Sequence, residues 1–233
     1  MKIEIYADGP TIEEMKTFDR SIVQGYTFNP SLFRKLGVED YLGYCWKVVA
    51  ASNGLPISLE VIADSQDEMI SQARILSALG DNVFVKIPIT YTSGVSTLLV
   101  LKALIEKGIN VNITAVFTEE QVDDILPFIV ESNTIISVFS GRIFDIGLDA
   151  VEITREIAGL VHAYDNWGNC KVLWASPRMS YDLINAQNAN CDIITMQPAL
   201  IKKLSLFEKT LEEYSLNTVQ MFYNDALLYR YNL

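Results

Sequence analysis

The chain has 233 residues, half of them hydrophobic, so it can bury a sizeable core. Its formal net charge of -11 argues against a surface for nucleic acid or anionic membrane, because either partner would be repelled by the average field of the protein. We therefore expect small molecules or further copies of the same chain as partners.

Short runs rich in β-branched residues recur along the chain and predict eight strands. They cover residues 3 to 7, 25 to 28, 57 to 62, 83 to 87, 110 to 116, 135 to 139, 171 to 175 and 192 to 196. Helical patterns lie between them, for example at residues 64 to 80, 93 to 108, 118 to 132 and 148 to 164. Such alternation implies a parallel sheet, and eight units in this length fit an α/β fold closed into a (β/α)8 TIM barrel.

The segment after the eighth strand is unusually apolar near its end, with Phe222, Leu227 and Tyr229 close together. We expect one barrel domain over residues 1 to 233, with an additional C-terminal helical extension over about residues 205 to 233. Two interpretations remain for this apolar surface, which should be covered. It packs across the bottom of its own barrel, or it docks on a neighbouring subunit.

The three cysteines, Cys45, Cys170 and Cys191, are far apart and form no CxxC pair. This spacing indicates buried free thiols, with neither a disulfide framework nor a metal site. The first residues contain no apolar stretch of signal-peptide length, and no run approaches the roughly 18 apolar residues of a membrane span. We therefore expect a cytoplasmic protein.

Side chains alternate between the two faces of a strand, and this alternation orients Lys86. On the fourth predicted strand Val83, Val85 and Ile87 form an aliphatic set that suits the surface between sheet and helices. Lys86 belongs to the opposite set, so we expect it to point into the barrel.

The same sorting, applied to the other strands, places polar side chains late in each strand on the inward set. On the seventh strand it groups Trp174 with Ser176, opposite Leu173 and Ala175. Because active sites of this fold lie at the C-terminal ends of the strands, we expect a polar cluster there. Its members are Asp8, Asn29, Glu60, Lys86, Thr114, Ser137, Arg142, Ser176 and Arg178.

An inward lysine suggests covalent chemistry. A lysine in a desolvating pocket loses its proton more readily and becomes an amine nucleophile, able to form a Schiff base with a carbonyl substrate. The iminium then acts as an electron sink, so that an adjacent carbon–carbon bond can break to give an enamine. Glu60 and Thr114, on the strands flanking the fourth, are the nearest candidates for proton transfer. The alternative is a lysine paired with Glu60 without chemistry. His162, the only histidine, is expected in an outer helix, outside this chemistry.

Five spaced segments carry a family resemblance. They are "TFNPSLF" from 27, "VFVKIPIT" from 83, "NITAVFT" from 112, "SVFSGRIFDIG" from 137 and "WASPRM" from 174. Taken in order, they resemble the transaldolase family, close to its small subfamily that includes fructose-6-phosphate aldolases. The resemblance implies that Lys86 forms the Schiff base and that Asp8 handles the proton on the hydroxyl at the cleaved bond. It implies that Glu60 and Thr114 work through a water on Schiff-base formation and hydrolysis.

The resemblance also implies a substrate site for sugar phosphates. Asn29 and Ser137 would hold donor hydroxyls, with Thr27 and Phe139 beside them. Arg142, Ser176 and Arg178 would grip the phosphate, which suits arginine because its guanidinium fork pairs with phosphate bidentately. No cofactor and no metal is expected. Members of the subfamily form pentamer-based rings, so a homo-oligomer, pentamer or decamer, is implied.

Two positions separate the activities within the family. Fructose-6-phosphate aldolases resemble "QV" where this chain has Glu60 and Val61, and they carry a tyrosine where it has Phe139. Phenylalanine cannot help a water protonate the enamine, so we expect a transaldolase. It would move a dihydroxyacetone unit from sedoheptulose 7-phosphate or fructose 6-phosphate to glyceraldehyde 3-phosphate or erythrose 4-phosphate, in the pentose phosphate pathway. The alternatives are an aldolase that releases free dihydroxyacetone and a non-catalytic sugar-phosphate-binding barrel.

The chain departs from the family pattern at a few positions. Phe28 stands where the family usually has the second threonine of a TTNPS motif, and its bulk is expected to narrow the donor site. Pro177 stands between Ser176 and Arg178, where an aromatic residue is usual, and is expected to shift the phosphate grip.

Overall fold

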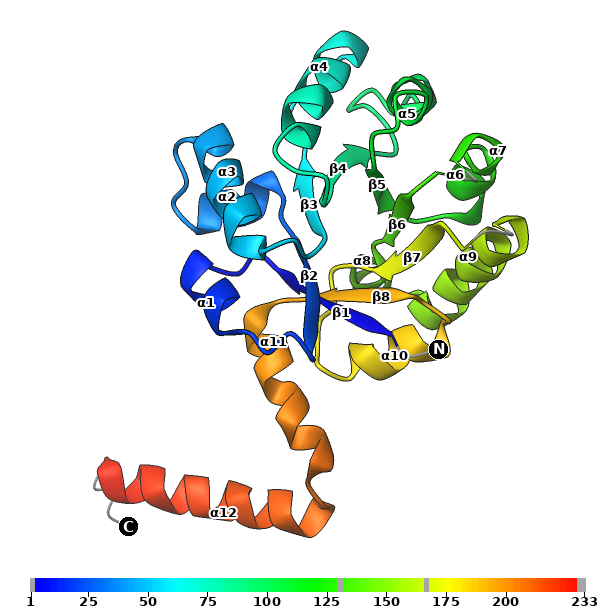
Figure 1. Ribbon diagram of the computed structural model, residues 1–233. Helices are drawn as coiled ribbons and strands as arrows, with labels where there is room; N and C mark the ends of the chain where they lie inside the picture. Colours follow the sequence, from blue (N-terminus) through cyan, green and yellow to red (C-terminus); the bar gives the residue numbers. More distant parts are fainter. Residues whose placement is uncertain (1–2, 130–131, 166–167, 230–233) are drawn as a thin grey trace. The chain divides into compact units, whose positions relative to one another are not determined.

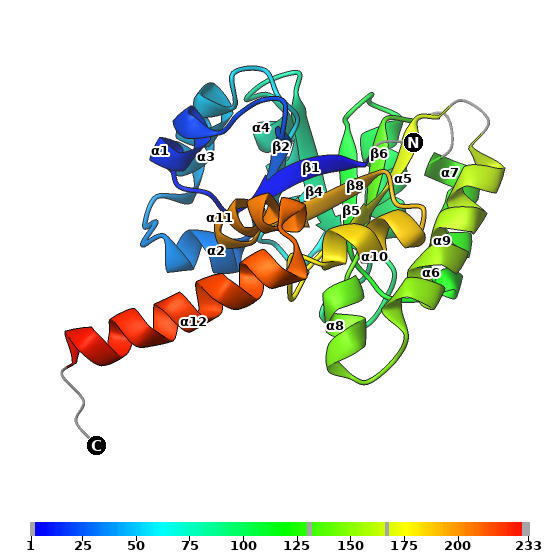
Figure 2. The same cartoon turned by 90° about the horizontal axis from the view of Figure 1, so that it is seen from below.

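The computed structural model describes residues 3–129, 132–165 and 168–229. Eight parallel strands pair in chain order and close into a barrel, because β8 pairs with β1. The strands are β1 (Glu4–Asp8), β2 (Val23–Thr27), β3 (Ile57–Glu60), β4 (Val83–Pro88), β5 (Val111–Val116), β6 (Thr134–Val138), β7 (Cys170–Trp174) and β8 (Ile193–Met196). The strands form an inner ring with helices outside it (Figures 1 and 2). The predicted (β/α)8 fold is confirmed.

Helices follow the strands around the barrel. They are α1 (Ile12–Thr17), α2 (Pro30–Lys35), α3 (Tyr41–Ser52), α4 (Gln66–Ser77), α5 (Leu98–Ile105), α6 (Glu119–Asp123), α7 (Leu126–Ile129), α8 (Ser140–Asp145), α9 (Ala150–Tyr164), α10 (Asp182–Asn188) and α11 (Pro198–Lys202). The single helix predicted over residues 118 to 132 is wrong, since α6 and α7 replace it. Pro127 explains the break. In a continuous helix its ring would clash with the carbonyl of Asp123, four residues earlier, and α6 ends at that residue. Proline is tolerated in the first turn of a helix, which is where it lies in α7.

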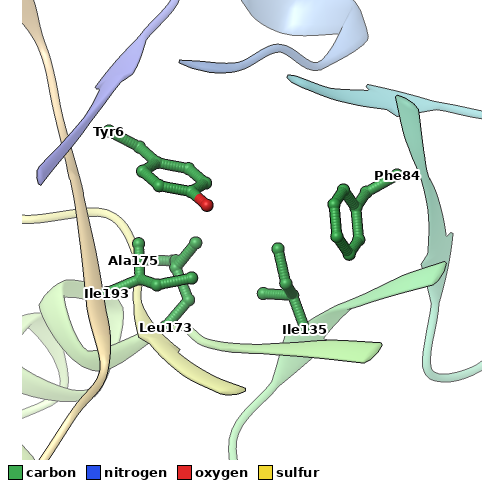
Figure 3. Packing of buried hydrophobic residues seen from close by; sticks show 6 residues of the cluster. All are labelled: Tyr6, Phe84, Ile135, Leu173, Ala175 and Ile193. Carbon is green, nitrogen blue, oxygen red and sulfur yellow. The ribbon is translucent and has the colours of Figure 1, made fainter. Parts of the chain in front are cut away.

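Part of the barrel interior is filled by apolar side chains. Side chains there point toward one another from five strands (Figure 3). The cluster consists of Tyr6, Phe84, Ile135, Leu173, Ala175 and Ile193. Gly25 makes room for the ring of Tyr6, since a Cβ at this glycine would lie 2.6 Å from the ring. Because Phe84 points inward, Lys86 two residues later does too, as the alternation predicts.

The orientation expected for the seventh strand is wrong. Leu173 and Ala175 belong to the interior cluster, whereas the buried ring of Trp174 lies 5.9 Å from that of Phe144 in α8, outside the barrel. The strand carries apolar residues on both faces, so its sequence gives no sign of which face is inward. Ser176 adopts a left-handed φ of 62° beyond the strand, and alternation does not extend to it.

Residues Lys202–Leu233 form a second compact unit, separate from Met1–Ile201. It contains a 3-10 helix, η1 (Lys203–Glu208), and the predicted C-terminal helix, α12 (Leu211–Leu228). A capping box formed by Thr210 and Glu213 starts α12. Large apolar side chains of α12 are exposed, among them Leu211, Val219 and Phe222. Within the described residues, no helix is long and apolar enough to cross a membrane.

Candidate active site

The predicted Lys86 and Glu60 meet inside the barrel. They are direct neighbours in the register of β3 and β4, and Lys86 Nζ lies 3.2 Å from Glu60 Oε2. Lys86 is only 5% exposed, and Phe84, two residues before it on the same face of β4, belongs to the interior apolar cluster. The hydroxyl of Tyr41 donates to the backbone carbonyl of Glu60 at 2.5 Å, which fixes the end of β3. A buried ammonium therefore has one carboxylate partner at the C-terminal ends of the strands.

Asp8 ends β1 beside Thr27, which ends β2. The hydroxyl of Thr27 lies 2.6 Å from Asp8 Oδ1 and 2.5 Å from the hydroxyl of Thr195 in β8. Desolvation raises the pKa of the Asp8 carboxyl, while the hydrogen bond from Thr27 and the positive charges of Lys86 and Lys35 oppose this rise. Sequence reasoning gave Thr195 no role, although its alternation with apolar Ile194 and Met196 marks it as inward.

Thr114 lies on β5, where the strand becomes irregular. Ala115 has a left-handed φ of 60°, and the register with β6 shifts between Ile113 and Val116. Thr114 is 1% exposed, and its hydroxyl has no hydrogen-bond partner in the described part of the chain. A buried hydroxyl without a partner is costly, so this one is available to a water or a substrate group.

A polar network crosses the barrel interior at the level of Lys86. Asn112 is the register neighbour of Lys86 on β5. Its side-chain nitrogen donates to the hydroxyl of Ser58 at 3.0 Å, and its oxygen accepts from Ser137 at 2.7 Å. The network bridges β3, β5 and β6. Of these three residues, only Ser137 belongs to the polar cluster predicted from the sequence.

Asn29 and Phe28 follow β2 and differ in what they contact. Asn29 caps α2, since its Oδ1 accepts from the backbone nitrogen of Leu32 at 2.9 Å, so its amide nitrogen is left as a donor. Phe28 is fully buried and its ring lies 5.4 Å from that of Phe33, in an aromatic group with Tyr41. The expectation that Phe28 narrows the donor site is wrong, because alternation puts it opposite the inward Thr27.

Arg178 already has an anionic partner. Its Nε donates to Asp145 Oδ1 at 2.9 Å and its Nη2 donates to Asp145 Oδ2, so α8 and the loop after β7 are tied together. The guanidinium lowers the pKa of the Asp145 carboxyl through these hydrogen bonds. One edge of the guanidinium fork is thus occupied, while Nη1 and the second hydrogen of Nη2 remain as donors.

The predicted phosphate residues lie on two segments in backbone contact. A Cβ at Gly141 would lie 1.6 Å from the carbonyl oxygen of Ser176, and the Gly141 nitrogen donates to the carbonyl of Ala175 at 3.3 Å. Arg142 follows Gly141 and is exposed, with its guanidinium 5.4 Å from the ring centre of Phe139. Glycine at 141 therefore brings Arg142, Ser176 and Arg178 to one side of the barrel mouth.

A cavity of about 270 Å³ adjoins Asp8 on the other side of the mouth. Its lining comes from the β1–α1 loop, α1, α2 and the residues after β8. Gly9, Glu14, Lys35 and Gln197 contribute to it. Asp8 therefore borders open space large enough for small polar molecules.

Comparison with known proteins decides the family. The family model described as "Transaldolase/Fructose-6-phosphate aldolase" matches residues 5–229. The chain belongs to this transaldolase family. A "Probable transaldolase" of Ruegeria sp. strain TM1040 is 33% identical over 80% of this chain and 81% of its own length. A protein of the same description from Cereibacter sphaeroides is 34% identical over 89% of this chain and 90% of its own.

Solved structures support the fold of this transaldolase-family chain. The thiamine phosphate pyrophosphorylase of Pyrococcus furiosus superposes with a TM-score of 0.55, covering 86% of this chain and 88% of that one. The two sequences are only 10% identical, so this likeness concerns the barrel architecture alone. The family assignment rests on the sequence match, while the site is built from the residues described above.

Proposed function

We propose that the protein is a class I transaldolase in which Lys86 is the Schiff-base nucleophile. The observation that carries the proposal is the ion pair of buried Lys86 and half-buried Glu60 on adjacent strands, 3.2 Å apart, at the C-terminal ends of the barrel strands. In this fold catalytic groups occupy those ends. The substrates are ketose and aldose phosphates, and the unit transferred is dihydroxyacetone.

The first step joins Lys86 to the donor ketose. Glu60 accepts a proton from the ammonium of Lys86, and the free amine adds to the C2 carbonyl of the ketose phosphate. The carbinolamine loses its oxygen as water and becomes an iminium. Thr114 has an unpartnered buried hydroxyl, which suits a water that relays the protons of this step with Glu60.

The second step breaks the carbon–carbon bond. Asp8 takes the proton of the C4 hydroxyl, the C3–C4 bond breaks, and its electron pair moves into the iminium to give an enamine on Lys86. The aldose phosphate leaves with a new carbonyl at its former C4 carbon. Asp8 suits this role because it borders the cavity at the mouth and accepts a hydrogen bond from Thr27 on its other side.

The third step passes the enamine to an aldehyde. The enamine carbon adds to C1 of the acceptor aldose phosphate, Asp8 returns its proton to the new alkoxide, and water releases the product from Lys86. Phe139 lies near Phe117, with ring centres 5.8 Å apart, and neither side chain carries a hydroxyl that could deliver a proton to the enamine. This supports transfer over simple cleavage.

The phosphate group is proposed to bind between Arg142, Ser176 and Arg178. Asp145 occupies one edge of the Arg178 guanidinium, so the phosphate would take the remaining hydrogens of Nη1 and Nη2. Asn29, Ser137 and Thr27 are proposed to hold the donor hydroxyls. For Ser137 and Thr27 the substrate would share a hydroxyl that already bonds within the protein.

A product assay tests the function. Fructose 6-phosphate is supplied with and without erythrose 4-phosphate, and both sedoheptulose 7-phosphate and free dihydroxyacetone are measured. We expect donor consumption to depend on the acceptor. Equal consumption without it, with release of dihydroxyacetone, would identify an aldolase, and binding without any turnover would identify a non-catalytic barrel.

We also propose that the protein is a homo-oligomer, a pentamer or decamer, held in part by α12. Its exposed apolar side chains require a partner surface, and a second copy of the chain is the partner that is always present. Deletion of residues 211 to 233, followed by measurement of mass in solution, tests this role. A smaller assembly is expected, and an unchanged mass would refute it.

A further inference from the structure

Three side chains from three neighbouring strands form a line that ends at Asp8. Thr195 of β8 contacts Thr27 of β2, and Thr27 contacts Asp8 of β1, with oxygen–oxygen distances of 2.5 and 2.6 Å. Thr27 and Thr195 are 2% and 4% exposed, so solvent does not compete for their hydroxyls. Asp8 and Thr27 have roles in the proposed reaction, whereas Thr195 has none there.

The number of hydroxyl protons determines which group donates and which accepts in each hydrogen bond of the line. An ionised Asp8 can only accept, so Thr27 must donate its one proton to Asp8. Thr27 then accepts from Thr195, and both hydroxyl protons are used. If Asp8 is protonated and donates to Thr27, the direction reverses and the Thr195 proton needs another acceptor. Within the described residues, the side-chain hydroxyl of Thr195 has no hydrogen-bond partner other than Thr27.

We propose that Thr195 is a positioning residue that acts on Asp8 through Thr27. When Thr195 donates its proton to the Thr27 hydroxyl, Thr27 donates its own proton to Asp8 Oδ1. This hydrogen bond favours the ionised form of Asp8 and holds Oδ1, so that the other carboxylate oxygen faces the substrate. The inference rests on the proposed function, in which Asp8 must be ionised to accept the proton of the C4 hydroxyl. Thr195 itself is not proposed to contact the substrate or the reacting atoms.

The charges around Asp8 act independently of Thr195. Lys86 from β4 and Lys35 from α2 favour the carboxylate, Glu60 from β3 disfavours it, and Glu14 from α1 lines the adjoining cavity. A change of Thr195 to valine leaves all four groups in place. Any change in the titration of Asp8 then comes from the hydroxyl line.

The test compares Thr195→Val and Thr195→Ser with the unmodified protein. Valine keeps the shape and removes the donor, so the acid limb of the kcat/KM profile should move to higher pH. At the acid end kcat/KM should fall by up to about tenfold, since the neutral hydrogen bond that holds the Thr27 proton on Asp8 is lost, with a smaller loss on the plateau. Thr195→Ser keeps the hydroxyl, so its pH profile of kcat/KM should match that of the unmodified protein.

Thr134→Val is the matched control. Its buried hydroxyl also pairs with a neighbouring hydroxyl, Ser132, at 2.7 Å, but it lies at the N-terminal end of β6. Loss of the Thr134 hydroxyl should leave the pH profile of kcat/KM unchanged. If Thr195→Val lowers activity equally at every pH, or if serine fails to restore it, the role of Thr195 is structural and the proposal is overturned.

A measurement without turnover separates this inference from the proposed function. Carboxyl signals of ¹³C-labelled aspartate are followed by NMR through a pH titration, with Asp8→Asn to assign the Asp8 signal. Thr195→Val should raise the pKa of Asp8, and Thr195→Ala gives the same test if the valine variant does not fold. An unchanged Asp8 titration overturns the inference even in an active enzyme. An inactive unmodified protein would instead refute the proposed function while the titration still reports on Thr195.

Discussion

Arg178 and Asp145, 33 residues apart in the chain, are joined by two hydrogen bonds between guanidinium and carboxylate. Such a bidentate pair fixes the plane of the guanidinium, which is the property that phosphate recognition needs. Both side chains are substantially exposed, so the pair contributes little to the stability of the fold. The main effect of the pair is to orient the guanidinium of Arg178.

Asp145→Asn should therefore weaken phosphate recognition. We expect KM for fructose 6-phosphate to rise roughly three- to tenfold with little change in kcat, because uniform binding is lost. Steady-state kinetics with phosphorylated and non-phosphorylated donors measure this. Glu13→Gln, which breaks the exposed Glu13–Lys16 pair of α1, is the control and should change neither constant. A lower KM in Asp145→Asn would mean that Asp145 competes with the phosphate.

Gly141→Ala should destabilise the protein and reduce activity. The added methyl group would lie 1.6 Å from a backbone oxygen of Ser176, which must shift. We expect a loss of about 1–3 kcal/mol in the free energy of unfolding, typical of overpacking. Gly159→Ala in α9 is the control, since nothing lies within 4 Å of its added Cβ, and it should stabilise by up to about 1 kcal/mol. Equal urea midpoints for Gly141→Ala and Gly159→Ala would contradict the close contact between Gly141 and the backbone of Ser176.

Phe139→Tyr should move activity from transfer toward cleavage. A hydroxyl at this position lies in the site beside Arg142 and can help a water protonate the enamine. We expect the release of free dihydroxyacetone without acceptor to rise about tenfold, less than the roughly 10²- to 10⁴-fold of a directly positioned general acid because the hydroxyl acts through a water. Phe117→Tyr changes the neighbouring ring and is the control. An unchanged ratio of transfer to cleavage in Phe139→Tyr would show that this position does not select the reaction.

The pair of His162 and Asp192 should make stability depend on pH. His162 Nε2 lies 2.9 Å from Asp192 Oδ2, and this hydrogen bond raises the pKa of the imidazole in the folded protein. The contribution is fully present below the unfolded histidine pKa of about 6.5 and is lost as pH rises through the raised folded pKa. Urea denaturation should show a larger gap between the unmodified protein and His162→Asn at acid than at alkaline pH. A gap that is constant with pH would contradict this.

Much of the fold follows from the sequence, since β-branched runs and alternation determine the eight strands and the inward Lys86. The failures have physical causes. On β7, Leu173 and Trp174 are both apolar, so only the pairing with β6 reveals which one faces inward. Ser176 leaves the strand geometry altogether. The hydrogen-bond partners of Arg178 and Thr27 come from distant parts of the chain, and the type of a residue alone does not predict which side chain it contacts.

The central claim is that Lys86 bonds covalently to the donor sugar. Borohydride reduction of the protein with fructose 6-phosphate, followed by peptide mass spectrometry, tests it most directly. We expect a reduced three-carbon adduct on the peptide that contains Lys86, and none in Lys86→Met. An unmodified Lys86 under saturating donor, or an adduct on another lysine, would contradict it.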